Sequence, residues 1–265
     1  MKKNLLKSNT KNIILSIVAV LFWLLVWEIA ALTVSKELIL PSPMLVLQRI
    51  SEWIFTTRFW IIISNSLLNI LLGILVGFIL GSVTAILTTY IKPFEILLKP
   101  FTTLIKVTPV ASFILLLILW TRRETIPSIV SVLIVFPIVW ANISQGIVSV
   151  DKKLVEVAKV FKIPLFKKIG YLYIPSVLPS VLSALRSSIG LAWKAGISAE
   201  ILALPQKTIG YEMFEAKNYL LRADVFAWTV VIILLSVIIE KIILFFFDKL
   251  LNNMIARRGV YDKDQ

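Results

Sequence analysis

Three strong charges lie within one long apolar stretch, residues 175–204. They are Arg186, Lys194 and Glu200, and at about 100° per residue they fall within a helical sector of roughly 120° that also contains Ser187. A charge at membrane depth is costly unless it meets water or a partner, so this pattern favours a helix face that lines a solute path. A cationic lining suits an anionic or strongly hydrogen-bonding solute. The alternative is helix packing, with Arg186 bound to a carbonyl and Glu200 neutralising Lys194.

Reaction chemistry has little support elsewhere in the chain. The sequence contains no cysteine and no histidine, which excludes thiolate chemistry, histidine relays, zinc or haem sites and a Ser-His-Asp triad. It also lacks paired carboxylates and the G-x-x-x-x-G-K-[ST] loop that cradles nucleotide phosphates. We therefore expect a non-catalytic chain without a cofactor or metal of its own, and any ATP must be hydrolysed by a different polypeptide.

The composition is that of an integral membrane protein. The 265 residues are 58% hydrophobic, the mean hydropathy is +0.92, and apolar runs near the length of a bilayer-spanning helix recur along the chain. The net charge of +13 does not indicate nucleic-acid binding, because the basic residues lie between apolar runs and not along one soluble face. The chain is thus predicted to be an all-α membrane protein.

Six spans are predicted, within a single transmembrane domain of residues 1–265. Their approximate bounds are 13–32, 60–89, 100–120, 127–148, 175–204 and 226–250. Prolines at the start of the third span predict a broken or kinked entry. A short amphipathic segment that ends at Ile54 precedes the second span and is placed outside the membrane.

The second span carries a stripe of small and amide side chains. Asn65, Asn69, Gly73, Gly77 and Gly81 recur at i+4 and share one helix face. Small residues let a neighbouring helix approach closely, and amides can hydrogen-bond across the contact. We therefore favour a helix-packing seam over an ion path.

Basic residues are distributed unevenly between the two sets of loops. If the N-terminus is cytoplasmic, the inner segments hold the following residues: Lys2, Lys3, Lys7, Lys11, Lys92, Lys99, the six lysines of residues 151–168, Arg257 and Arg258. The positive-inside rule then predicts both termini in the cytoplasm. The same rule places residues 151–174 on the cytoplasmic side, where ATP is found.

Residues 151–174 form the one long amphipathic segment between spans. Apolar side chains such as Leu154, Phe161 and Leu165 recur at helical spacing among six lysines. The chemistry alone fits two structures equally: a helix on anionic lipid, or a helix docked on another protein.

Several motifs together resemble the membrane permease subunits of bacterial ABC importers, in the nitrate/sulfonate/taurine group of binding-protein-dependent permeases. The most specific is the cytoplasmic EAA loop, which here reads Glu156-Val157-Ala158, with Lys162 where glycine is expected, and a Tyr173-Ile174-Pro175 end. Supporting matches, which extend the similarity over nearly the whole length, are LPSP at Leu40, NSLLNILLG at Asn65, PVASF at Pro109, the stretch from Leu178 to Glu200, and IGYEMF at Ile209.

The resemblance implies a type I importer permease fold with a cytoplasmic coupling helix that sits in a groove of an ATPase. The residues that would make this contact are Glu156, Val157, Ala158, Phe161, Lys162, Pro164 and Leu165. Val157 and Lys162 depart from the motif, and Pro164 could supply the bend that the family's glycine makes.

The same resemblance implies the partners and the compartment. They are a second permease copy, two ATP-binding subunits that hold ATP and Mg²⁺, and an extracytoplasmic solute-binding protein, all at a bacterial plasma membrane. Nitrate, sulfonates, taurine and vitamin precursors are all compatible solutes. The competing class is an ion-gradient-driven secondary transporter or a channel, whose usual inverted repeats and intramembrane acidic or histidine relays are not found in the sequence.

Overall fold

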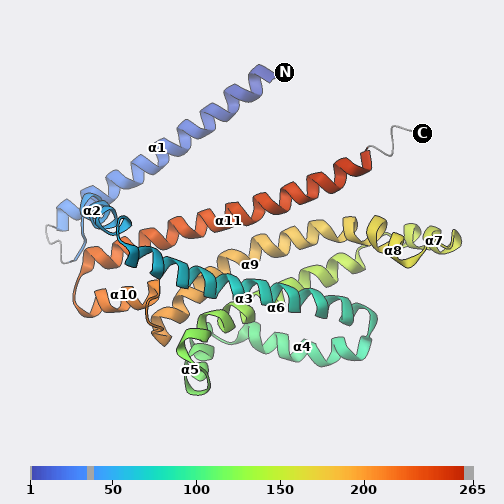
Figure 1. Cartoon of the computed structure of the whole chain (residues 1–265). Coiled ribbons are helices and arrows are strands. Elements are labelled where there is room, and N and C mark those ends of the chain that lie inside the picture. Colours follow the sequence, from blue (N-terminus) through green and yellow to red (C-terminus); the bar gives the residue numbers. More distant parts are fainter. Residues whose placement is uncertain (1, 35–38, 260–265) are drawn as a thin grey trace. The chain divides into compact units, whose positions relative to one another are not determined.

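The computed structural model describes residues 2–34 and 39–259, and the side chains of residues 14–34, 39–247 and 249 (Figure 1). Every regular element in these residues is helical, as predicted. The basic side chains at both ends that support the predicted topology, among them Arg257 and Arg258, lie outside the described side chains.

The helices follow one another with short connections. Their bounds are α1 Lys2–Val34, α2 Pro43–Ile54, α3 Thr57–Tyr90, α4 Lys92–Val107, α5 Val110–Trp120, α6 Ile126–Val148, α7 Lys152–Val160, α8 Leu165–Lys168, α9 Ile174–Ala203, α10 Ile209–Asn218 and α11 Arg222–Gly259. A 3₁₀ turn, Arg123–Thr125, precedes α6, and a π-helical turn, Ile169–Tyr173, leads into α9.

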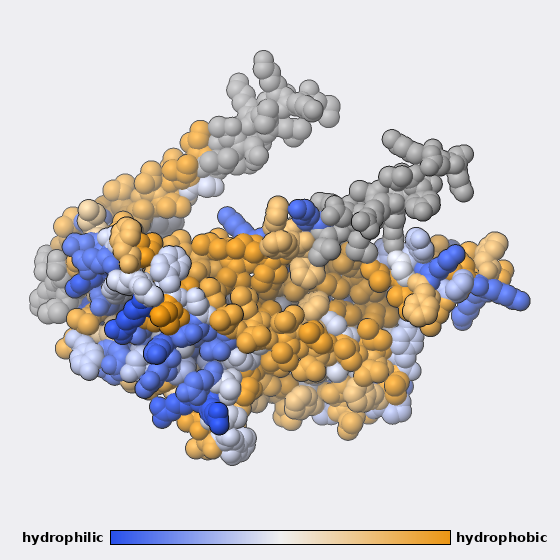
Figure 2. Space-filling view, in the orientation of Figure 1, coloured by the Kyte–Doolittle hydropathy of each residue, from blue (hydrophilic) through white to orange (hydrophobic). Residues whose placement is uncertain are grey.

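Five segments of the described chain are long and apolar enough to cross a membrane. They are Ile14–Val34, Thr57–Tyr90, Arg123–Val148, Leu165–Ala203 and Arg222–Phe247. Apart from Arg123–Val148, half of which is buried, these segments leave most of their apolar surface exposed, and Figure 2 shows the apolar band that covers the side of α3. A surface of this kind suits hydrocarbon and not water.

The third predicted span, residues 100–120, differs from a single helix. It begins earlier, at Lys92, and consists of α4 and α5, which are bent by 104° at Thr108 and Pro109. Pro109 has no N–H to donate, and its ring pushes Thr108 out of the helical region, to a ψ of 129°. The break expected from the prolines thus occurs at Pro109, whereas Pro100 is accommodated inside α4. Counting the bent pair as one span gives six.

The described residues form two compact units, which fall within the bounds Met1–Ile61 with Glu212–Ile232 and Ile62–Tyr211 with Ile233–Gln265. That residues 1–265 make one transmembrane domain stays a prediction. The first unit is built around Trp228, which stacks on Trp53 with ring centroids 4.9 Å apart and on Phe59 at 5.5 Å. Two ion pairs, Arg49–Asp224 and Arg58–Glu212, join its segments at 3.3 and 2.8 Å.

The second unit has α6 and α9 at its centre, side by side in Figure 1. Helix α3 packs on α6 through Gly73, Gly77 and Gly81. A Cβ on Gly77 would lie 2.9 Å from the Cβ of Val135, and a Cβ on Gly81 would lie 2.8 Å from that of Val139. Any larger side chain at these two positions would therefore push the helices apart.

The amide residues of the same stripe add hydrogen bonds to this packing. The Asn65 side chain donates to the carbonyl of Lys207 at 3.0 Å, and the backbone carbonyl of Asn69 accepts from the Ser128 hydroxyl at 2.7 Å. The first bond attaches α3 to the loop before α10, and the second attaches it to the start of α6.

A buried carboxylate joins α3, α9 and the start of α10. Glu200 has no exposed surface, and its Oε2 accepts from the Ser66 hydroxyl at 2.9 Å and from the Gly210 N–H at 3.0 Å. Ser66 in turn accepts from the Ile209 N–H at 2.9 Å. The first backbone N–H groups of α10, which have no partner within the helix, are thereby satisfied. We call these four residues the Glu200 junction.

Replacement of Glu200 tests whether this junction holds the second unit together. Glu200→Ala removes the acceptor of two buried donors, and each unpaired group costs about 1–3 kcal/mol. Glu200→Gln keeps an acceptor oxygen in the same place. We expect a large fall in the thermal unfolding midpoint of the purified protein for the alanine variant and a smaller one for glutamine. Equal midpoints for the two variants would contradict this role.

Candidate functional site

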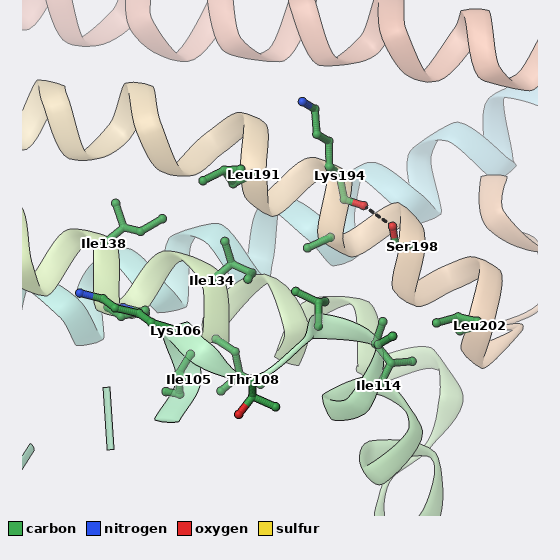
Figure 3. A pocket seen from close by; sticks show the side chains of 15 residues that line it. Ile105, Lys106, Thr108, Ile114, Ile134, Ile138, Leu191, Lys194, Ser198 and Leu202 are labelled. Atoms are coloured by element: carbon green, nitrogen blue, oxygen red, sulfur yellow. Dashed lines mark hydrogen bonds between the residues drawn. The ribbon is translucent and has the colours of Figure 1, made fainter. Parts of the chain in front are cut away.

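A pocket of about 460 Å³ lies at the break between α4 and α5, against α6 and α9 (Figure 3). Its lining is mostly aliphatic, from residues such as Ile114, Ile134 and Leu191. The polar side chains on it are those of Lys106, Thr108, Lys194 and Ser198. The fold thus brings two lysines from distant parts of the sequence to one apolar hollow.

The two lysines enter from different helices. Lys194 projects from the middle of α9 and is exposed, whereas Lys106 lies in the last turn of α4, where a cation complements the helix dipole. Figure 3 shows their ammonium groups pointing in different directions. The Ser198 hydroxyl donates to the Lys194 carbonyl at 2.9 Å. The cations therefore mark the edges of the pocket and not a single binding point, and an anion in the pocket would approach each from a different side.

The remaining residues of the predicted polar face separate. Arg186 and Ser187 are exposed and line a different hollow, of about 550 Å³, with Pro179, Leu182 and Ser183. Glu200 belongs to the Glu200 junction and faces neither hollow. The reason is geometric: the charges span about 21 Å of helix, and the neighbours of α9 change along that length.

Lys106 and Thr108 were not among the residues singled out from the sequence. Lys106 is a strong charge inside the predicted third span, which is the same signal that selected Lys194. Its place beside α9 follows from the 104° bend between α4 and α5. The prolines in the sequence predict a break there but not the angle of the bend.

The predicted coupling segment is a helix-turn-helix. The Asp151 carboxylate caps α7 by accepting from the Lys153 N–H at 2.8 Å, and α7 ends at Val160. Lys162 has φ of 48°, in the left-handed region, and Pro164 follows at the start of α8. The bend therefore lies at Lys162 itself, where the family has glycine, and Pro164 starts the next helix. A lysine in this conformation is strained relative to glycine.

Nearly all of this segment is exposed. Val157, Phe161 and Leu165 are 49%, 75% and 66% exposed, and Glu156, Lys162 and Pro164 are exposed as well. Ala158 is the exception: it is 6% exposed, and its carbonyl accepts from the Ile163 N–H at 3.0 Å. Its backbone thereby closes the turn, and the docking role predicted for its side chain stays a prediction.

Comparison with known proteins gives a family. The profile of the binding-protein-dependent transport system inner membrane component matches residues 73–257. A Bacillus subtilis (strain 168) protein named for aliphatic sulfonates transport is 27% identical over 83% of this chain and 79% of its own. The taurine transport system permease protein of Escherichia coli (strain K12) is 23% identical over 78% of this chain and 77% of its own length.

A third relative matches over a shorter region. The bicarbonate transport system permease protein of Synechocystis sp. is 35% identical over 32% of this chain and 31% of its own. The matched family covers the glycine seam, the pocket at the helix break and the helix-turn-helix. The chain therefore belongs to the binding-protein-dependent transport system inner membrane components and is an ABC importer permease of the nitrate/sulfonate/taurine group.

Proposed function

We propose that this chain is the membrane-spanning subunit of an ATP-driven importer and passes a small anionic solute from a binding protein into the bacterial cytoplasm. The observation that carries the coupling role is the exposure of the α7–α8 helix-turn-helix on nearly every side. A second permease copy, two ATPase subunits with ATP and Mg²⁺, and the extracytoplasmic binding protein complete the assembly. Both termini are placed in the cytoplasm.

The family of the chain favours a groove in a partner protein over a flat lipid surface for α7. At 100° per residue, Glu156 lies roughly opposite Phe161 around the helix, and both are exposed. A helix that lies on lipid buries one side and leaves the other in water. A groove in a partner protein can contact both sides, so that the apolar residues are buried while Glu156 accepts hydrogen bonds. We therefore assign α7 and α8 to the ATPase, with Ala158, Lys162 and Pro164 shaping the turn.

The solute class is inferred from the pocket and the relatives together. The solutes in the relatives' names are aliphatic sulfonates, taurine and bicarbonate, and each carries a negatively charged oxygen group. Lys106 and Lys194 supply cations at the edges of an otherwise apolar hollow, and a charge-assisted hydrogen bond to an anion is strong. We propose that the solute passes between these lysines.

The path extends along α9 from this pocket. Arg186 and Ser187 lie about 12 Å from Lys194 along the helix and border an exposed hollow of their own. We place them on the same path. Glu200 is assigned to the junction, because its carboxylate is buried and hydrogen-bonded.

Phe161→Asp tests the coupling role. Phe161 is 75% exposed, so the change should leave the permease folded, but it puts a charge on the surface that would be buried in the groove. We expect ATPase subunits to be lost from the purified complex and ATP-dependent uptake to stop. The measurement is co-purification of the ATPase with the tagged permease, followed by uptake into proteoliposomes.

Tyr219→Asp is the matched control. It puts the same charge on a residue next to α10 that is 71% exposed and lies, in the predicted topology, on the extracytoplasmic side of the membrane. It should retain the ATPase. Normal ATPase recovery with Phe161→Asp would rule out the docking role, and uptake that needs an ion gradient and not ATP would indicate a secondary transporter.

Substitution of the two pocket lysines tests the solute path. A hydrogen bond to a charged group contributes about 1.5–3 kcal/mol. Lys194→Met or Lys106→Met should therefore lower the rate of uptake at low solute concentration roughly 10- to 100-fold. Complex assembly should be unchanged. Lys99→Met serves as the control, since Lys99 also lies on α4 but does not line this pocket. If all three variants transport equally well, the pocket is a packing feature.

A further inference from the structure

A second apolar pocket, of about 340 Å³, lies between α3, α6 and the beginning of α9. Its lining residues come from all three helices and from the π-helical turn. They include Phe78, Ser82, Ile86, Tyr90, Tyr173 and Ile174. None of them belongs to the glycine seam, the Glu200 junction or the lysine pocket.

The lining of the pocket is apolar apart from one serine and two tyrosines. Ser82 is the one serine or threonine in the lining of the pocket. The Ser82 hydroxyl already donates to the Phe78 carbonyl at 2.7 Å. The two phenols, Tyr90 and Tyr173, interact with each other. Beside them, the Lys168 Nζ lies 5.9 Å from the centre of the Tyr173 ring. The site therefore offers an apolar slot with two phenols in its lining and a cation, Lys168, over the ring of one of them.

This arrangement selects its ligand by chemistry. A water-soluble solute would gain few hydrogen bonds from such a lining, whereas a hydrocarbon chain gains from burial along all of it. The cation and the phenols complement a phosphate group, to which tyrosine donates and lysine is attracted. Ile86 and Ile174, at the edge of the pocket, are 50% and 43% exposed, so an acyl chain can enter from the bilayer.

We propose that this pocket binds one anionic phospholipid, with an acyl chain between α3, α6 and α9 and its phosphate at Lys168, Tyr90 and Tyr173. The lipid would contact α3 and the π-helical turn Ile169–Tyr173, which connects the α7–α8 segment to α9. π-Turns inside helices often occur at functional sites. A bound lipid would brace the turn through which motion of α8 reaches α9. Lipid binding itself does not depend on the ATPase.

The test is lipid retention by the purified full-length protein. The protein is reconstituted in nanodiscs that contain equal amounts of phosphatidylglycerol and phosphatidylcholine, transferred to detergent, and its bound lipids are counted by native mass spectrometry. We expect phosphatidylglycerol to be retained preferentially. Lys168→Gln should lower its retention about fivefold, the effect of one basic residue near a lipid headgroup. Ile86→Trp should lower it by filling the entrance.

Each variant has a matched control. Lys159→Gln removes a lysine of α7 that is away from the pocket, and Ile79→Trp enlarges an α3 residue that is 51% exposed and does not line it. Both should retain the lipid as the unchanged protein does. Equal retention of the two lipids, equal loss in variants and controls, or full retention by both pocket variants would each overturn the proposal.

Discussion

The close approach of α3 to α6 is the constraint on which the rest of the second unit depends. Gly77 and Gly81 bring the α3 backbone onto Val135 and Val139, so α3 and α9 can pack on the same central helix. In a membrane, where burial of apolar surface gives no advantage over lipid, such close packing is a main source of helix association. The Glu200 junction and the apolar pocket beside Tyr90 include residues of α3, and the lysine pocket lies on α6, so all three adjoin one of the two helices that meet at this contact.

Polar groups are concentrated at defined places around this apolar centre. At one end of α9, Glu200 is enclosed, and its Oε2 anchors the start of α10. Lys194, further along the same helix, is left exposed at a pocket. At the other end, Tyr173 meets Tyr90 from α3. Because unsatisfied polar groups are costly in hydrocarbon, each of these positions must either be closed by the chain or opened to water or a ligand.

Much of the fold could be predicted from periodicity and length, because apolar runs and i+4 stripes are local properties. The amphipathic helix before Ile54, the break near Pro109 and the face of α3 that carries glycine are of this kind. Whether Glu200 shares an environment with Lys194 is different. It depends on which helix lies against each turn of α9. A helical wheel drawn from one segment does not show the helices that pack around it. The place of Lys106 needed the same tertiary information, whereas the conformation of Lys162 belongs to a local, exposed turn.

The bend at Pro109 has a consequence for water. Because proline has no N–H, the carbonyl of Ile105 cannot receive the usual helical bond from residue 109, and the carbonyls of the last turn of α4 end beside the lysine pocket. Such groups are tolerated at membrane depth only where protein or water covers them. The bend therefore adds backbone acceptors to the polar side chains at the pocket, and water or a solute that donates hydrogen bonds can satisfy them.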